Sequence, residues 1–224
     1  MAADELAFFG KIAAGVTHEL KNVLAIIRES NGLMADLIAL AKDSPFPQRE
    51  RFLRSVDRIE DQVRRGVDIT SRFNRFSHSM DHASANIDLN EIVAQTVALT
   101  CRFARLKEIE LLGTPSEGPV TLTTSPFRLQ MALTKAIEAC IESMPGKGTI
   151  RVDVPGNPAG PELTIHCETR EGSVLDLKEV VTASRPWLEL EQLVPDLGIG
   201  IGWRQPGAGI TLSFSTDEVN EPEQ

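Results

Sequence analysis

Two long stretches without proline dominate the first third of the chain and constrain its fold most. Apolar residues recur in both at three- and four-residue intervals, the heptad spacing of helices that pack against one another. The repeating positions are Val16, Leu20, Val23, Ile27, Ser30, Met34 and Leu37, then Phe52, Val56, Ile59, Val63, Gly66, Thr70 and Phe73. A segment with Pro45 and Pro47 separates them and predicts a turn over residues 43–47. We therefore predict an antiparallel helical hairpin.

Further apolar residues lie off these two seams. They are Leu24, Ile26, Leu33 and Ile38. One hairpin cannot bury both its seams and these positions, whereas two copies can bury them in a four-helix bundle. A homodimer is therefore expected. The alternative is that the hairpin packs on the C-terminal half of its own chain.

The rest of the chain alternates between strand and helix patterns. After a polar linker at 81–86, strands are predicted at 87–89, 109–112, 120–123, 149–154 and 162–167, with two closing strands around a turn at 205–209. Helices are predicted at 90–106, capped by Asn90, at 126–143, and within 175–193. The expected class is α+β, with a helical hairpin at residues 1–82, an α/β sandwich at 87–216 and an acidic tail at 217–224.

Composition excludes several functional classes. The net charge of −9 and the pI of about 5.0 disfavour nucleic acid and anionic membranes as partners. The chain shows no membrane-spanning apolar run and no signal peptide, so a cytoplasmic location is expected. The 3 cysteines lie far apart, as reduced core thiols do. His78 and His82 share a helical spacing but lack a third ligand, so no metal site is expected.

His18 is the candidate catalytic residue. It lies two positions from Val16 and from Leu20, and such a step turns about 200° around a helix, so its ring points away from the seam. Neutral imidazole is a nucleophile that can accept and release a phosphoryl group. Alone, such a residue is more often an ordinary solvated histidine; the motif around it changes that balance.

Neighbouring residues complete the expected site. Glu19 could bond the ring or collect its proton, and Asn22, one turn on, could orient a water or a phosphoryl oxygen. The docking face for a partner is expected to comprise Lys11, Gly15, Lys21, Ala25 and Arg28. In it Gly15 and Ala25 leave room beside the ring, and the three cations add positive charge.

The segment from Phe9 to Asn22 resembles the H-box of bacterial histidine kinases. Its His-Glu-Leu-Lys-Asn core follows a Gly- and Ala-rich lead-in, although Val23-Leu24 replaces the usual Pro-Leu. Residues 64–77 and 88–93 also resemble the second helix and the entry to the ATP-binding domain of that family. The resemblance covers most of the chain. It implies a dimerisation and histidine-phosphotransfer hairpin followed by an ATPase-like domain of the GHKL type.

The ATP-binding motifs of that family are degenerate in this chain. Lys135 stands where the family has a magnesium-binding Asn, and a cation repels Mg²⁺ and offers no oxygen ligand. Residues 168–172 lack the Asp and the first Gly of the adenine-contacting motif. Gly198, Gly200 and Gly202 fit a strand better than a phosphate loop. These departures from the family's motifs lead us to expect no nucleotide cofactor.

A histidine without ATP can only obtain a phosphoryl group from another protein. The chain then resembles the stand-alone dimeric phosphotransferases of phosphorelays, and the expected partners are response-regulator receiver domains. As an enzyme it would be a protein-histidine phosphoryl carrier. Two alternatives stay open: an active sensor histidine kinase with divergent ATP-binding boxes, or a response-regulator phosphatase or non-catalytic regulator that uses Asn22.

Overall fold

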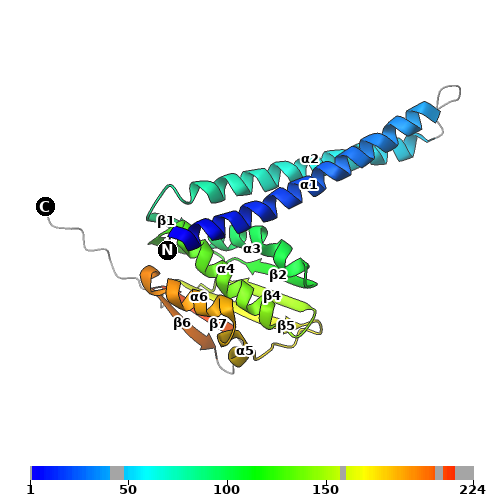
Figure 1. Cartoon of the computed structure of the whole chain (residues 1–224). Coiled ribbons are helices and arrows are strands. Elements are labelled where there is room, and N and C mark those ends of the chain that lie inside the picture. The colour runs from blue at the N-terminus through cyan, green and yellow to red at the C-terminus, as the bar shows by residue number, and fades with distance from the viewer. Residues whose placement is uncertain (1, 41–47, 157–159, 205–208, 215–224) are drawn as a thin grey trace. The chain divides into compact units, whose positions relative to one another are not determined.

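The computed structural model describes residues 2–40, 48–156, 160–204 and 209–214. The chain divides into a helical unit, Ala2–Arg75, and a second unit that begins at Phe76 (Figure 1). The turn predicted at 43–47, most of the turn at 205–209 and the acidic tail at 217–224 lie outside the described residues. Within the described ranges, no helix combines the length and the apolarity needed to cross a membrane.

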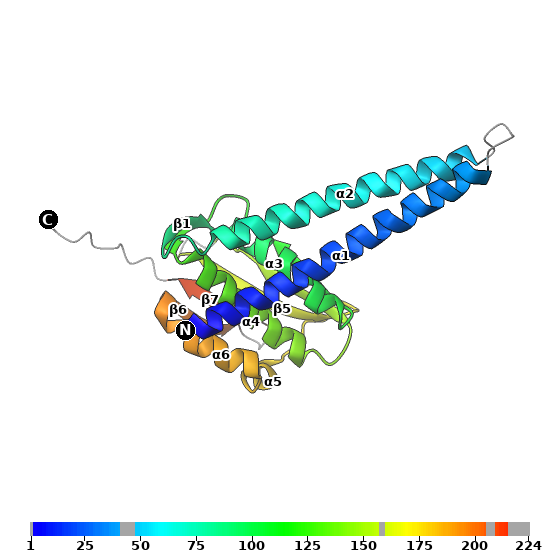
Figure 2. The same ribbon diagram turned by 45° about the horizontal axis from the view of Figure 1, so that its top comes forward.

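The helical unit is an antiparallel hairpin of α1 (Ala2–Leu40) and α2 (Arg49–His78), as predicted. The two helices run side by side in both views (Figure 1, Figure 2). The rings of Phe9 and Phe73 lie 5.9 Å apart, centroid to centroid. Further along, a Cβ added to Gly66 would lie 3.3 Å from Cγ1 of Val23, so the backbone of α2 passes close to α1 there.

The seam of α1 is the predicted one, whereas the packed face of α2 matches the predicted seam at only about half of its positions, among them Gly66 and Phe73. Val16, Val23, Ser30 and Leu37 are buried on α1. On α2, however, Ser55 and Ile69 are buried, while Val56 and Val63 are 37% and 49% exposed. The register of the hairpin thus decides which residues of α2 are buried, even where the buried residue is a serine. The two valines form a neighbouring exposed stripe with Leu53 and Val67.

The second unit is built on a mixed sheet of five strands in the order β2-β4-β5-β7-β6. The strands are β2 (Ile109–Thr114), β4 (Gly148–Asp153), β5 (Glu162–Thr169), β6 (Ile199–Arg204) and β7 (Gly209–Phe214). β2 and β4 pair in parallel, and all other neighbours are antiparallel. A separate antiparallel pair joins β1 (Ala85–Asp88) to β3 (Thr121–Thr124). Together with the hairpin, this sheet and its helices confirm the α+β class.

Helices pack on this sheet, with α4 (Pro126–Ser143) between α3 (Leu89–Arg105) and α6 (Arg185–Leu193) (Figure 1). Because it has neighbours on several sides, α4 is buried along most of its length. Two details differ from the predictions. Asp88 rather than Asn90 caps α3, because the Asp88 carboxylate accepts a hydrogen bond from the backbone N–H of Asn90. The single helix expected in 175–193 is divided into α5 (Lys178–Thr182) and α6, because Ser184 caps a new helix that Pro186 favours.

Candidate functional site

His18 lies on α1 with its side chain exposed. The Asn22 side-chain nitrogen, Nδ2, is 3.3 Å from Nδ1 of the His18 ring. This contact follows from the four-residue spacing, which stacks the two side chains on one helix face. Among the described residues, this is the one hydrogen bond of the His18 ring. The Nε2 side of the ring is therefore the side that a partner can approach.

The hydrogen bond at Nδ1 determines which ring nitrogen can react. If Nδ1 carries the proton, Nε2 keeps a lone pair and can act as a nucleophile. Asn22 favours that tautomer when its amide oxygen accepts from Nδ1, which requires only a half-turn of the amide from the orientation in the structure. Asn22 can thus fix both the tautomer and the rotamer of the ring.

The other predicted site residues differ in exposure. Lys11, Lys21, Ala25 and Arg28 are exposed, as a docking face requires, and Glu19 is half-buried. Gly15, in contrast, is buried. It lies three residues after Ile12 and directly before Val16, so it borders the apolar side of α1 and does not widen the open surface beside His18.

Lys135 lies at the centre of a charged cluster in the second unit. Its ammonium nitrogen is 2.5 Å from Oε2 of Glu189 on α6 and 3.8 Å from Oε2 of Glu138 on α4. Nε of Arg185 lies 2.8 Å from the other oxygen of Glu189. Hydrogen bonds from Lys135 and then from Arg185 lower the pKa of the Glu189 carboxyl, against an opposing effect of burial. The sequence indicated Lys135 and Glu138 but not Glu189 or Arg185.

This cluster does not fit a magnesium site. The carboxylates of Glu138 and Glu189 already face the Lys135 ammonium, and a second cation there would be repelled. Within the described part of the chain, no group of His, Cys, Asp and Glu side chains is arranged to hold a metal ion. The cluster joins α4 to α6 with a cation that the chain itself supplies.

Apolar side chains fill the space between α4, β5 and the segment that leads to α5. The lining comprises Cys140, Ile165, Cys167, Leu175, Leu177, Val181, Trp203, Gly209 and Ile210, and it leaves a cavity of only about 10 Å³. Pockets for small molecules hold roughly 300–1,000 Å³. A hydrogen bond with Cys167, together with burial, raises the pKa of the Cys140 thiol, so this thiol stays protonated. The space is core and not a ligand site.

Of the three glycines predicted to lie in a strand, Gly200 and Gly202 do, whereas Gly198 lies in the turn before it. Gly200 and Gly202 lie in β6, and a Cβ on Gly200 would come within 2.7 Å of Oγ of Ser213 on β7. Gly198 has φ of +63° and ends the short 3₁₀ turn Pro195–Leu197. None of the three opens a helix, where glycine-rich loops bind phosphate.

Comparison with known proteins identifies relatives along most of the chain. Sensor histidine kinase ZraS of Salmonella typhi is 22% identical over 198 residues, which cover 88% of this chain and 40% of the relative. Sporulation kinase B of Bacillus subtilis is 20% identical over 217 residues, 96% of this chain and 46% of the relative. Over most of its length the chain is therefore similar to sensor histidine kinases.

The chain spans less than half the length of those kinases. It covers 32% of the C4-dicarboxylate transport sensor protein DctB of Pseudomonas aeruginosa, at 23% identity over 203 residues. No family model matches the chain. Solved structures that align with it include a bacterial phosphotransferase, which is 15% identical and has a TM-score of 0.45. That alignment covers 92% of this chain and 95% of the phosphotransferase chain. The histidine kinase AdeS of Acinetobacter baumannii is 14% identical, with a TM-score of 0.43, and the alignment covers 90% of this chain and 98% of the AdeS chain.

Proposed function

We propose that this chain is a two-component signalling protein that relays a phosphoryl group between response-regulator receiver domains through His18, without using ATP. The relationship to sensor histidine kinases supports the two-component assignment. The observation that carries the relay proposal is the Lys135 cluster. The Lys135 ammonium lies between Glu138 and Glu189, and Lys135 occupies the sequence position at which the resemblance implies a magnesium-binding Asn. Without that metal the chain needs a phosphorylated protein as its donor.

The proposed transfer is a reversible in-line displacement. The lone pair on Nε2 of His18 attacks the phosphorus of an aspartyl phosphate, a P–N bond forms, and the P–O bond to the aspartate breaks. The aspartate leaves as a carboxylate, and the proton stays on Nδ1, where the Asn22 amide oxygen can accept its hydrogen bond after a half-turn of the amide. The same steps in reverse pass the group to a second receiver.

The working form is proposed to be a cytoplasmic homodimer. Both helices of the hairpin carry exposed apolar residues, among them Leu24 at 63%, Ile38 at 57%, Val63 at 49% and Val67 at 62% exposure. On α2, Val63 and Val67 belong with Leu53 and Val56 to the apolar stripe beside the packed face. A stripe of this kind is the usual mark of a protein–protein interface, and a second copy would cover it in a four-helix bundle.

Phosphotransfer from a panel of labelled, phosphorylated receivers tests the proposal. At least one receiver should label the wild-type chain, and His18→Ala should abolish the labelling. His82→Ala, an exposed histidine in the linker after α2, serves as the control and should be labelled normally. Labelling of His18→Ala at the wild-type rate would contradict the proposal. So would autophosphorylation with labelled ATP and Mg²⁺, which would indicate an active kinase.

A receiver phosphatase is a second candidate because Asn22 is held beside His18. Its amide could align a water against an aspartyl phosphate. The same panel separates the two functions. Dephosphorylation that survives His18→Ala and is lost in Asn22→Ala would favour the phosphatase over the relay.

A further inference from the structure

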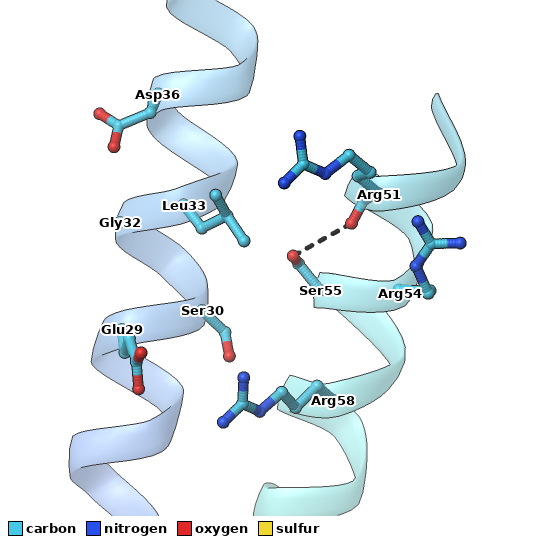
Figure 3. A pocket seen from close by; sticks show the side chains of 9 residues that line it. All are labelled: Glu29, Ser30, Gly32, Leu33, Asp36, Arg51, Arg54, Ser55 and Arg58. Carbon is cyan, nitrogen blue, oxygen red and sulfur yellow. Dashed lines mark hydrogen bonds between the residues drawn. The ribbon is translucent and has the colours of Figure 1, made fainter. Parts of the chain in front are cut away.

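A groove runs between the two helices toward the end of the hairpin farthest from Phe9 and Phe73. It encloses about 540 Å³ and is lined by Glu29, Ser30, Gly32, Leu33 and Asp36 of α1 and by Arg51, Arg54, Ser55 and Arg58 of α2 (Figure 3). This volume is in the range of small-molecule pockets. In a chain of net charge −9, its lining contains three arginines against two carboxylates.

Ser30 provides the first sign of a ligand. Its side chain is only 3% exposed, and its hydroxyl oxygen has no hydrogen-bond partner. In Figure 3 this hydroxyl points from α1 toward α2, and the Arg58 side chain extends toward it from the opposite wall. The other serine of the groove, Ser55, is already satisfied, since it donates to the Arg51 carbonyl oxygen at 3.1 Å. A buried hydroxyl without a partner costs free energy, and a bound acceptor would recover it.

Arg51 and Arg58 provide the second sign. They lie one heptad apart on α2, and both guanidinium groups reach across the groove toward α1 (Figure 3). No ion pair or side-chain hydrogen bond of either is found within the described ranges. Arg54 instead points outward and pairs with Glu50 at 3.7 Å. The carboxylates of Glu29 and Asp36 are directed away from the two guanidinium groups in the same view.

We propose that Ser30, Arg51 and Arg58 form an oxyanion-binding site. Guanidinium groups bind phosphate and carboxylate through paired, charge-assisted hydrogen bonds, and the Ser30 hydroxyl can donate a further one. The anion can come from a phosphorylated small molecule or from a carboxylate on a docked protein. The site does not include His18, so it is independent of the phosphotransfer proposal.

Isothermal titration of the full chain with tripolyphosphate and with succinate, at constant ionic strength, tests the site. Saturable binding is expected for at least one probe, and it should be lost in the Arg51→Gln, Arg58→Gln double variant. Arg54→Gln, which removes a neighbouring arginine that faces outward, should bind as the wild type does. Tighter binding of tripolyphosphate indicates a phosphorylated ligand, and equal or tighter binding of succinate indicates a carboxylate. No saturable heat with either probe, or unchanged binding by the double variant, overturns the proposal.

Ser30→Ala separates binding from folding. The variant removes an unpartnered buried hydroxyl, so its melting temperature should equal or exceed that of the wild type. Anion affinity should nevertheless fall about tenfold, the effect of losing one charge-assisted hydrogen bond. Unchanged affinity would exclude Ser30 from the site. His18→Ala should retain full anion binding, so that failure of the relay proposal and failure of this one are distinguished.

Discussion

The Asn22 amide lies one helical turn beyond His18 and contacts Nδ1 of its ring at 3.3 Å. If this contact fixes the reactive tautomer, Asn22→Ala should slow phosphoryl transfer about tenfold without abolishing it, as expected for one lost hydrogen bond. Rapid-quench measurement of the transfer rate checks this. Asn31→Ala, at another exposed asparagine of α1, is the control. Equal rates for both variants would show that Asn22 does not position the ring.

Ala25 is an exposed small residue seven positions after His18 and lies on the same side of α1. Ala25→Trp should lower the transfer rate at least tenfold, because an indole would keep a docked receiver from reaching Nε2. Circular dichroism and sedimentation should show unchanged helicity and association. Ala25→Ser adds little volume and should transfer normally. A wild-type rate for Ala25→Trp would mean that receivers dock elsewhere.

Charge around His18 should affect encounter more than chemistry. Lys21 and Arg28 are exposed, and reversing either charge should slow association with a receiver more at low salt than at high salt. Stopped-flow association rates across a salt series measure this effect. A rate reduction that does not change with salt would indicate a steric cause instead.

The Lys135–Glu189 pair predicts a pH-dependent stability. The pKa of Glu189 is lowered in the folded protein, so the stability that it contributes is present above its ordinary pKa of 4.5 and is lost as the pH falls through the folded value. Lys135→Met should reduce the free energy of unfolding by about 2 kcal/mol near neutral pH and should weaken this acid dependence. Urea titrations at about pH 7 and about pH 4 measure both.

Lys147→Met is the matched control for that variant. Lys147 also lies 2.5 Å from a glutamate, Glu108, but the two side chains are 50% and 66% exposed. Solvent screens such a pair, so its loss should change stability by less than about 1 kcal/mol. If both lysine variants change the free energy of unfolding by the same amount, burial does not strengthen the ion pairs of Lys135.

Val63 lies in the exposed stripe of α2. Val63→Asp should weaken the homodimer about 100-fold, because dimerisation would bury a carboxylate without a partner. The mass measured by sedimentation should fall from twice the chain mass toward the mass of a single chain, 24.5 kDa. Arg65→Asp changes an exposed residue of the same helix outside the stripe and should remain dimeric. A wild-type chain that is monomeric at micromolar concentration would contradict the proposed interface.

Local spacing predicted some of these features, and long-range register determined the others. The contact of Asn22 with His18 could be predicted because both lie on one helix, four residues apart. Glu189 lies 54 residues after Lys135, and nothing in the local sequence links them. The apolar pattern predicted Val56 on the packed face of α2, whereas the hairpin buries its neighbour Ser55. The placement of Ser30 and Arg58 on opposite walls of one groove depends on that same register and could not be predicted from either helix alone.

The parallel pairing of β2 with β4 has a consequence for how the chain folds. Ile109 pairs with Gly148, and β3 and α4 lie between them in the sequence, whereas Arg204 and Gly209 close the β6–β7 hairpin locally. Closing the longer loop costs more conformational entropy, so β2 should join the sheet after the local hairpins have formed. Until then its backbone is an unpaired strand. On a ribosome, β2 emerges before β4 has been synthesised, and its unpaired edge is then open to pairing with other nascent strands.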